Sequence, residues 1–284
     1  MNRIDMVLDT DTYNEVDDQF ALVYALLSKE LDVKAVYAAP FHNERSNNPK
    51  DGMERSYDEI VRLLTLMNKK IDGFVFKGSD RYMGETPCEN EAVHDLIKRA
   101  RTYTPEHRLH VASIGAPTNI SSAITIAPDI IKNIKVVWLG GNDFSYPSGR
   151  EFNLMQDYEA SCVLFDSGVE LVQIPCWSVA SHLMVGVPEL RACMGSSAIA
   201  GALVDIVEEA VSKKPFMTRV IWDISAIAYL INSQWVLTKK VHSPVLNRNC
   251  MYSFDERRHF IDVAYKLNRN QIFEDMYLKI RSMD

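Results

Sequence analysis

Short, continuously apolar segments alternate with segments of helical period over the first 175 residues of this chain. The apolar segments cover residues 6–9, 33–39, 73–78, 109–115, 134–141 and 169–175. Helical patterns lie between them at residues 17–27, 53–67, 91–103, 117–126 and 157–166, and later at 197–213, 217–232 and 270–283. Buried parallel strands read as unbroken apolar runs. The alternation therefore predicts an α/β fold, a doubly wound and mostly parallel sheet with a helical C-terminal portion.

Composition narrows the class of protein. The net charge is −7 and no basic block is present, which argues against a nucleic-acid partner. No apolar run approaches the roughly 20 residues that span a bilayer, and the first residues lead into acids rather than into a signal-peptide apolar region. The five cysteines are scattered without a CxxC pair, so neither a zinc site nor a disulfide framework is indicated. We expect a cytoplasmic protein without a membrane partner.

A dense acidic segment follows the first apolar run. Five carboxylates occur within ten positions, at Asp9, Asp11, Glu15, Asp17 and Asp18. Carboxylates this close repel one another unless they are protonated, spread into solvent or gathered around a cation. In a doubly wound sheet, ligands bind beyond the carboxyl ends of the strands, where this segment begins. Oxygen ligands alone indicate a hard metal ion.

The segment is compatible with more than one protein class. Asp9-Thr10-Asp11-Thr12 fits the DxDx[TV] motif of haloacid-dehalogenase-type phosphatases only in part, because Tyr13 stands where Thr or Val is expected. In that class Asp9 would be the nucleophile and Asp11 the acid/base. A calcium loop of the EF-hand type is excluded, since no glycine occupies the sixth position and Phe20 replaces the closing glutamate. A solvated acidic loop is the plain alternative.

Three later segments favour a different class. They are Gly115-Ala116-Pro117-Thr118-Asn119 after an apolar run, Glu151-Phe152-Asn153, and Trp222-Asp223 near the start of an apolar helical pattern. An aspartate at a helix N-terminus is also favoured by the helix dipole alone. Together with the earlier acids Asp9, Asp11, Asp17 and Asp18, however, these segments resemble the inosine–uridine-type nucleoside hydrolase family. The resemblance keeps the same order and covers most of the chain. The phosphatase interpretation leaves the Glu-Phe-Asn and Trp-Asp segments without a role.

The resemblance implies a set of site residues. A calcium ion would be bound by Asp11, Asp18, Asp223 and the backbone carbonyl of Thr118. The implied substrate contacts are Asp17 and Asn153 at the ribose hydroxyls and Glu151 at the 5′ side, with Asn43 and Asp223 around them. Trp222, beside Asp223 in the sequence, is a further candidate for substrate binding. Asp9 would support the loop from behind. N-glycosidic cleavage develops positive charge on the sugar, which nearby anions stabilise, and a carboxylate accepts the proton of the attacking water. We expect Asp11 to be that base.

The chain departs from the family pattern in three places. Residues 12–16 form a loop two residues longer than the usual one, which could bring Asn14 or Glu15 to the substrate. Trp222 stands where purine-cleaving members often carry a histidine, the acid that protonates the leaving group. The stretch between Asn142 and Glu151 lacks the usual Gly-Asn, which puts one 5′-hydroxyl contact in doubt.

These departures make the leaving-group acid an open question. Trp222 could stack on a base, although a tryptophan in an apolar helix more often belongs to the core. The histidines His42, His182, His242 and His259 are expected to be structural or solvated rather than catalytic.

The sequence thus predicts a calcium-dependent N-ribohydrolase built as a single domain over residues 1–284. Its partner would be a small-molecule nucleoside or N-riboside, and we expect a homodimer or homotetramer. Two alternatives stay open: a magnesium-dependent phosphohydrolase, and a non-catalytic protein that binds ribose or a nucleoside.

Overall fold

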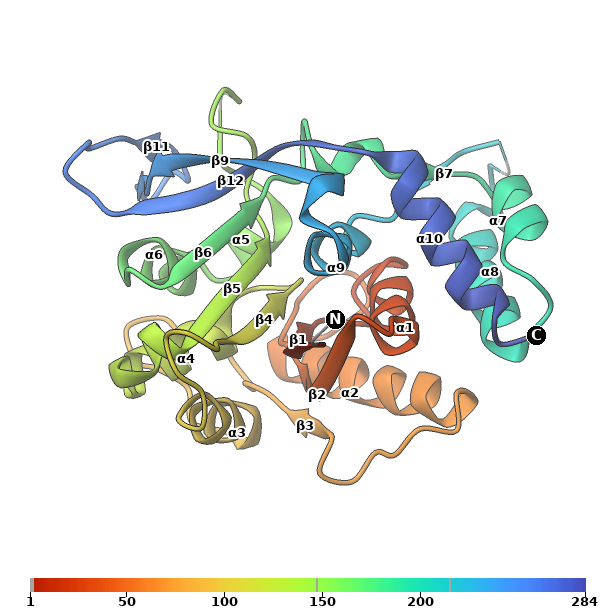
Figure 1. Ribbon diagram of the computed structural model, residues 1–284, viewed down its shortest axis with the longest axis horizontal. Coiled ribbons are helices and arrows are strands. Elements are labelled where there is room, and N and C mark those ends of the chain that lie inside the picture. Colours follow the sequence, from red (N-terminus) through yellow and green to blue (C-terminus); the bar gives the residue numbers. More distant parts are fainter. Residues whose placement is uncertain (1–2, 147, 215) are drawn as a thin grey trace.

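A long sheet runs through the middle of the protein in the computed structural model, which describes residues 3–146, 148–214 and 216–284 (Figure 1). Counted over those residues, it has eight strands. Across the sheet they are β3 (Val75–Lys77), β2 (Leu31–Ala38), β1 (Ile4–Thr10), β4 (Leu109–Ser113), β5 (Ile134–Leu139), β6 (Glu170–Ile174), β12 (Phe260–Leu267) and β9 (Val236–His242). Neighbouring strands pair in parallel except β12 and β9, which are antiparallel. The predicted fold class and its six parallel strands are confirmed.

Helices cover both faces of this sheet (Figure 1). One face carries α1 (Asp18–Leu27), α2 (Pro49–Leu66), α7 (Val187–Cys193), α8 (Ala198–Val211), α9 (Ile224–Ile231) and α10 (Arg269–Arg281). The other carries α3 (Glu91–Ala100), α4 (Thr118–Ile126) and α6 (Tyr158–Asp166). Shorter elements are α5 (Phe152–Gln156), the 3₁₀ turns η1 (Pro128–Asn133), η2 (Ala180–His182) and η3 (Ser233–Trp235), and the strand pairs β7 (Met184–Val185) with β8 (Arg219–Val220) and β10 (Val245–Leu246) with β11 (Tyr252–Ser253).

The two helical layers explain why the strands read as unbroken apolar runs. Side chains alternate between the faces of a strand. In β1, Met6 and Leu8 belong to the core beneath α1 and α9, whereas Val7 belongs to the core beneath α3 and α4. All three side chains are fully buried. A strand covered on both sides therefore carries mostly apolar residues between its ends.

The C-terminal region departs in part from the sequence prediction. The helix expected over residues 217–232 begins only at Ile224, because β8 precedes it and Asp223 takes the N-cap position. Strands β9 and β12, which extend the sheet beyond β6, were not predicted from the sequence. Both strands are partly exposed and contain lysines, so neither stands out as a continuous apolar run.

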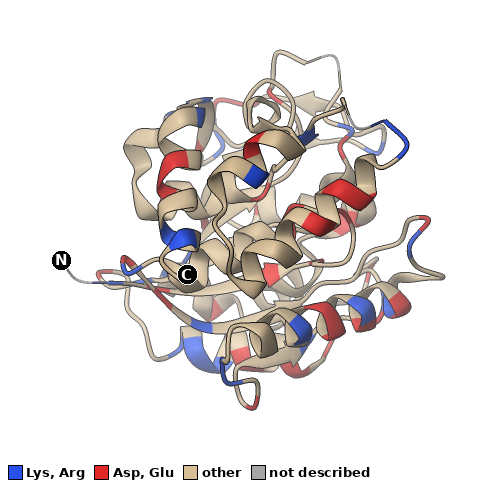
Figure 2. Cartoon of the chain, turned by 90° about the vertical axis from the view of Figure 1, so that its right-hand side faces the viewer, with Lys and Arg blue, Asp and Glu red and all other residues tan. Residues whose placement is uncertain are grey.

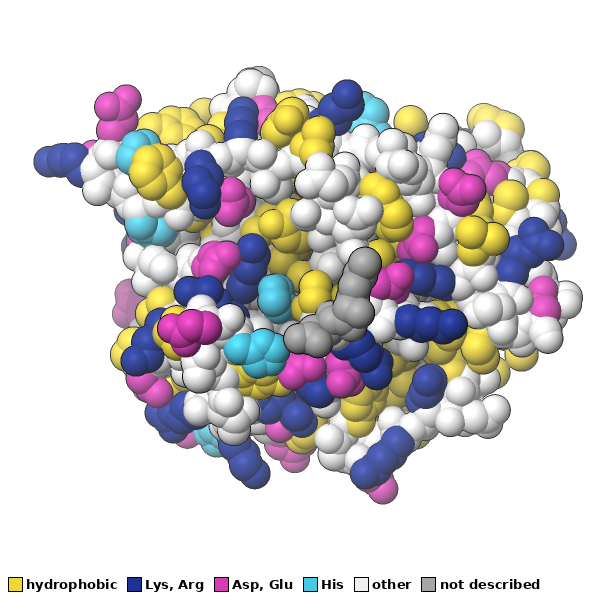
Figure 3. Space-filling model, viewed as in Figure 1, with side chains coloured by type: hydrophobic (Ala, Val, Ile, Leu, Met, Phe, Trp, Pro, Cys, Tyr) yellow, Lys and Arg dark blue, Asp and Glu magenta, His cyan; other side chains and the backbone are white. Residues whose placement is uncertain are grey.

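The outer surface carries mixed charge. Figures 2 and 3 show Lys and Arg interspersed with Asp and Glu on the two drawn sides. None of the helices in the described part of the chain is both long and apolar enough to cross a membrane.

The strand order reverses between β1 and β4, and this reversal positions the acidic segment. The chain runs from β1 outward through β2 and β3, and then returns to place β4 on the other side of β1. The backbone stays paired up to Asp9 and Thr10, whose carbonyls accept from the amides of Ile114 at 2.9 Å and Ala39 at 2.8 Å. Asp11 is therefore the first residue to leave the sheet, into the crevice that a reversal of strand order opens.

Asn119 fixes the segments around this crevice. Its Nδ2 donates to Asp9 Oδ1 at 2.8 Å. Its Oδ1 accepts from the backbone N–H of Ser79 at 2.9 Å and from the Ser79 hydroxyl at 2.7 Å. Gly78 permits this approach, because a Cβ there would lie 2.4 Å from Asn119 Nδ2. One amide thus joins the ends of β1 and β3 to α4.

We predict that Asn119→Ala lowers the free energy of unfolding by about 2–4 kcal/mol, because it leaves buried groups of Asp9 and Ser79 without partners. Urea denaturation followed by circular dichroism measures this. The matched control is Asn270→Ala on the exposed side of α10, expected to change stability by no more than about 0.5 kcal/mol. Equal stability of the two variants would show that Asn119 does not fix the crevice.

Candidate functional site

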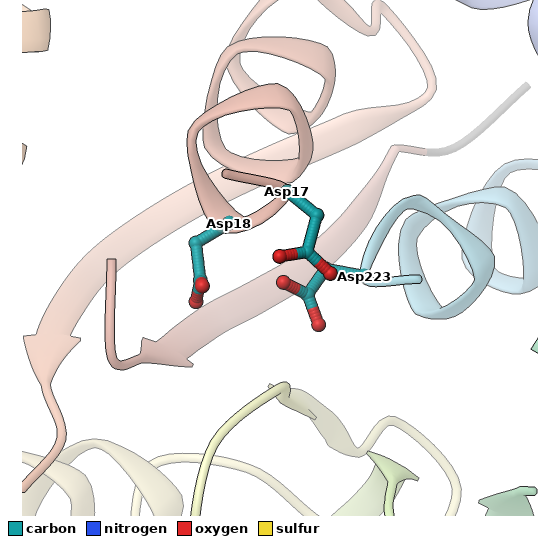
Figure 4. A group of neighbouring side chains, drawn as sticks. All are labelled: Asp17, Asp18 and Asp223. Carbon is teal, nitrogen blue, oxygen red and sulfur yellow. The ribbon is translucent and has the colours of Figure 1, made fainter. Parts of the chain in front are cut away.

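Three carboxylates from distant parts of the chain converge at the reversal point. Ligand oxygens of Asp17, Asp18 and Asp223 all lie within 4.8 Å of one another, and all three residues are buried (Figure 4). Asp17 is the N-cap of α1 and Asp223 is the N-cap of α9. An aspartate at this position usually accepts from the helix's own N–H groups, but neither side chain does so here. Both carboxylates are left free to face a ligand.

Asp11 lies against this group, deeper in the protein. Its side chain is fully buried, and neither carboxylate oxygen has a hydrogen-bond partner. The turn after β4 packs against it, since a Cβ on Gly115 would lie 2.9 Å from Asp11 Oδ1. A buried carboxylate without a partner is costly unless a proton or a cation accompanies it.

Burial raises the pKa of every acid in the cluster. Burial holds the pKa of Asp11, Asp17 and Asp223 well above its usual range, and repulsion between the neighbouring carboxylates adds to the effect. The pKa of Asp18 rises only to about 6, because the rise from burial is offset by hydrogen bonds. One of these comes from Thr10, whose Oγ1 donates to Asp18 Oδ1 at 2.6 Å. Four hard oxygen donors in this state are suited to hold a cation such as Ca²⁺ or Mg²⁺.

Asp9 and Thr118 flank the cluster. Burial raises the pKa of Asp9 to about 7, and Asn119 holds its side chain. Thr118 opens α4, three residues after Gly115, and its hydroxyl donates to Asp157 Oδ2 at 2.7 Å. The side chain of Thr118 is thus occupied by Asp157.

A cavity of about 150 Å³ opens above the acids. Of the predicted site residues, its wall contains Asp17, Asp18, Glu151, Asn153, Trp222 and Asp223. The rest of the wall is Asn14, Glu15, Ile114, Leu139, Phe152, Cys176 and Trp177. Asp11, Thr118 and Asn43 lie outside the wall. Six of the site residues predicted from the sequence therefore lie around one cavity.

Glu151 and Asn153 are fixed by the backbone around them. Glu151 is the N-cap of α5, and its carboxylate accepts from the N–H groups of Asn153 at 2.9 Å, Leu154 at 3.1 Å and Gly141 at 2.8 Å. Asn153 Nδ2 donates to the carbonyls of Ile114 and Leu139, both at 3.0 Å. Asn153 therefore joins the ends of β4 and β5. Its Oδ1 takes no part in these two hydrogen bonds.

Asn43 lies outside the cavity wall and contacts a residue of the wall. Its Nδ2 donates to the Asn14 side chain at 2.7 Å, and Asn14 is in the wall. The predicted contact between Asn43 and a substrate is thus replaced by support of the lengthened loop, residues 12–16.

Arginines hold this loop in place. Arg45 donates to the carbonyl of Glu15 at 3.0 Å, and its guanidinium lies 5.8 Å from the centre of the Tyr13 ring. Arg219 Nη2 donates to Glu15 Oε2 at 2.5 Å. The loop therefore presents Asn14 and Glu15 to the cavity, as the sequence analysis considered, and keeps Tyr13 outside it.

Two tryptophans form an aromatic corner of the cavity. Trp177 and Trp222 meet edge to face, with ring centres 5.6 Å apart and planes at 73°. Trp177 is 49% exposed. Sequence reasoning missed Trp177 and Cys176, although both follow the end of β6, at the edge where a doubly wound sheet binds ligands.

The four histidines named in the sequence analysis, His42, His182, His242 and His259, are absent from the described wall of the cavity. The backbone N–H of His42 donates to Gln156 Oε1 at 2.8 Å. His182 Nδ1 lies 3.1 Å from the Val179 carbonyl, and His242 Nδ1 lies 2.7 Å from the Arg258 carbonyl. Burial lowers the pKa of His259. Their expected structural role agrees with these contacts.

Comparison with known proteins adds a family. Residues 6–274 match the family model described as inosine-uridine preferring nucleoside hydrolase. A curated relative, a pyrimidine-specific ribonucleoside hydrolase (RihA) from Salmonella newport strain SL254, is 27% identical over 181 residues. That alignment covers 55% of this chain and 55% of the relative, so the chain matches about half the length of this relative.

Solved structures show the same fold over nearly the whole chain. A plant nucleoside hydrolase, PpNRh1, matches with a TM-score of 0.77 at 16% identity, covering 99% of this chain and 100% of its own. A purine-preferring ribonucleoside hydrolase from Gardnerella vaginalis matches with a TM-score of 0.75 at 19% identity, covering 98% of both chains.

The raised pKa values predict how stability depends on pH and on cations. Without a cation, the folded protein holds more protons than the unfolded chain between the usual aspartate pKa, about 4, and the raised values. Those values are about 6 for Asp18 and about 7 for Asp9. The free energy of unfolding must then fall as the pH rises through this window.

We therefore expect the Tm in EDTA to fall between pH 5 and pH 8, and added Ca²⁺ or Mg²⁺ to raise it by about 5 °C or more at pH 8 but little at pH 5. Thermal unfolding by calorimetry measures both effects. In Asp18→Asn the gain from the cation should shrink. If neither Ca²⁺ nor Mg²⁺ changes the Tm at pH 8, a metal centre at this site is contradicted.

Proposed function

Because this chain belongs to the inosine-uridine preferring nucleoside hydrolase family, we propose that it hydrolyses the N-glycosidic bond of ribonucleosides or related N-ribosides with a bound calcium ion. The observation that carries the proposal is the convergence of Asp17, Asp18 and Asp223 beside the unpartnered carboxylate of Asp11. The products would be ribose and the free base. The relative and the structural neighbour named above differ in base preference, so neither sets the base for this chain.

The proposed metal ligands are Asp11, Asp18, Asp223 and the backbone carbonyl of Thr118. Hard oxygen donors without histidine or cysteine suit calcium better than zinc. The absence of a hydrogen-bond partner at either carboxylate oxygen of Asp11 supports its place in the set, because a ligand oxygen must be free to bind. A bound calcium ion would orient a water molecule and make it more acidic.

Asp11 is the proposed base, which accepts the proton of that water. Bond cleavage leaves positive charge on the ribose ring, and the buried carboxylates around the cavity stabilise this charge. Asp17 and Asn153 would hold ribose hydroxyls, and the Oδ1 of Asn153 supports this role because only its Nδ2 is engaged with the backbone. Glu151 is placed for the 5′ side, since it lies in the same wall.

The heteroaromatic base of the substrate would lie against Trp177 and Trp222. Both rings are in the wall, and Trp222 immediately precedes Asp223 in the chain. A flat aromatic leaving group gains stacking energy there. Neither tryptophan supplies a proton near neutral pH, because the indole N–H is not appreciably acidic.

The phosphohydrolase alternative receives less support from the geometry. That chemistry needs Asp9 as an exposed nucleophile, but Asp9 is fully buried, held by Asn119, and outside the cavity wall. A binding protein that kept the site without turnover is the alternative that experiment must separate. The single domain, the cytoplasmic location and the homodimer or homotetramer stay predictions from the sequence.

Asp11→Asn should reduce turnover of p-nitrophenyl riboside by about 10²–10⁴-fold, because it removes the base and weakens the metal site. The release of p-nitrophenol, followed by absorbance, measures this. The matched control is Asp205→Asn on the exposed side of α8, which should keep normal turnover. An Asp11→Asn enzyme as fast as the control would rule out Asp11 as the base.

We expect turnover of p-nitrophenyl riboside to exceed that of inosine by about 10²-fold or more, since the activated leaving group needs no protonation. The ratio of kcat/KM for the two substrates tests this. It should survive alanine substitution at His42, His182, His242 and His259, none of which lines the described cavity. A ratio near one would mean that another group protonates the base. Ribose binding without turnover of either substrate would favour the binding protein.

A further inference from the structure

The described wall of the cavity carries charge of one sign only. Its ionisable side chains include five carboxylates, and it contains no lysine, arginine or histidine. The carboxylates are Glu15, Asp17, Asp18, Glu151 and Asp223. Asp11 adds a sixth just beneath the wall. One divalent cation balances two negative charges, so the loaded site would still be anionic.

Glu15 brings this charge to the outer part of the cavity. Its side chain is 43% exposed, whereas the acids of the cluster are buried. Arg219 holds one of its oxygens from outside the wall, and Arg45 holds its backbone carbonyl. The carboxylate is therefore fixed in position on the lengthened loop.

The aromatic corner adds a second feature of the same kind. Trp177 and Trp222 line the cavity together with the acids. The face of an indole ring attracts a cation, more strongly than the face of any other aromatic side chain. An aromatic ring that carries a positive charge would gain from both the stacking and the carboxylates.

We propose that the preferred substrates are cationic N-ribosides, in which the glycosidic nitrogen belongs to a positively charged aromatic ring such as a pyridinium or an N7-alkylated purine. This inference rests on the proposed hydrolase function. It also agrees with the presence of Trp177 and Trp222 in the wall, because neither indole supplies a proton near neutral pH.

The reaction balances without such a donor. The bond from C1′ to the ring nitrogen breaks, and its electron pair stays on the nitrogen, which neutralises the ring. The oxygen of water forms the new bond to C1′, and one proton of that water passes to a carboxylate and then to solvent. The products are ribose, a neutral heteroaromatic base and H⁺. A neutral nucleoside such as inosine must instead receive a proton on its departing base.

The test compares 1,7-dimethylinosine, whose methylated N1 and N7 give it a fixed positive charge, with 1-methylinosine, which is neutral and has nearly the same shape. We expect kcat/KM of the wild-type enzyme to be at least about 100-fold higher for 1,7-dimethylinosine. Because that substrate is also more reactive in water, the decisive quantity is how a variant changes this ratio. Glu15→Gln removes one charge and should lower the ratio about tenfold, as one lost unit charge at close range does. Glu15→Asp keeps the charge and should keep most of the ratio.

Glu44→Gln is the matched control, because Glu44 is an exposed carboxylate on the next loop and is not in the cavity wall. It should leave the ratio unchanged. An unchanged ratio in Glu15→Gln, or equal use of the two substrates by the wild type, would overturn the inference. If p-nitrophenyl riboside is still hydrolysed in that case, the proposed function stands and only the preference for cations fails. No turnover of any riboside would overturn both.

Discussion

Repulsion among buried carboxylates is the constraint on which the rest of this site depends. Asp11, Asp17, Asp18 and Asp223 are fully or almost fully buried, and repulsion from neighbouring carboxylates adds to the rise that burial causes in the pKa of Asp11, Asp17 and Asp223. A protein tolerates such a group only when a proton or a cation compensates it. The surroundings are arranged so that compensation by a cation is possible. Two helix N-termini hold carboxylates without using them as caps, and Gly115 lets the backbone approach the Asp11 carboxylate, which has no hydrogen-bond partner.

The sequence was sufficient for those parts of the molecule that follow from local pattern. Parallel strands are buried on both faces, so their apolar runs could be recognised one by one. The reversal of strand order then placed residues 9–18 and 115–119 at one edge of the sheet. Trp177 could not be found in this way, because it follows a strand end without any motif of its own. Asn43 was misplaced for a related reason, since its partner Asn14 lies on a loop of unusual length.

The loop of residues 12–16 carries Asn14 and Glu15 in the cavity wall, next to Asp17 and Asp18 where α1 begins. Arginines from two other segments fix the backbone and the side chain of Glu15. No pattern within the loop indicates these arginines, which lie 30 and 204 residues further along the chain. Contacts of this range are outside the reach of sequence periodicity.

The carboxylates of this cavity suit two proposed functions, binding of a cation and stabilisation of positive charge on the sugar. They do not suit a third, which is protonation of the leaving group. Carboxylates bind a hard cation and stabilise positive charge on a sugar, so both functions favour more of them. Protonation of a leaving group has a different requirement. It needs an acid that carries a proton, in a cavity whose carboxylates favour cations. In the proposed binding mode, Trp222 offers the leaving group an aromatic surface but no acidic proton. A substrate whose leaving group is already positively charged would need none, because breaking the glycosidic bond neutralises that charge.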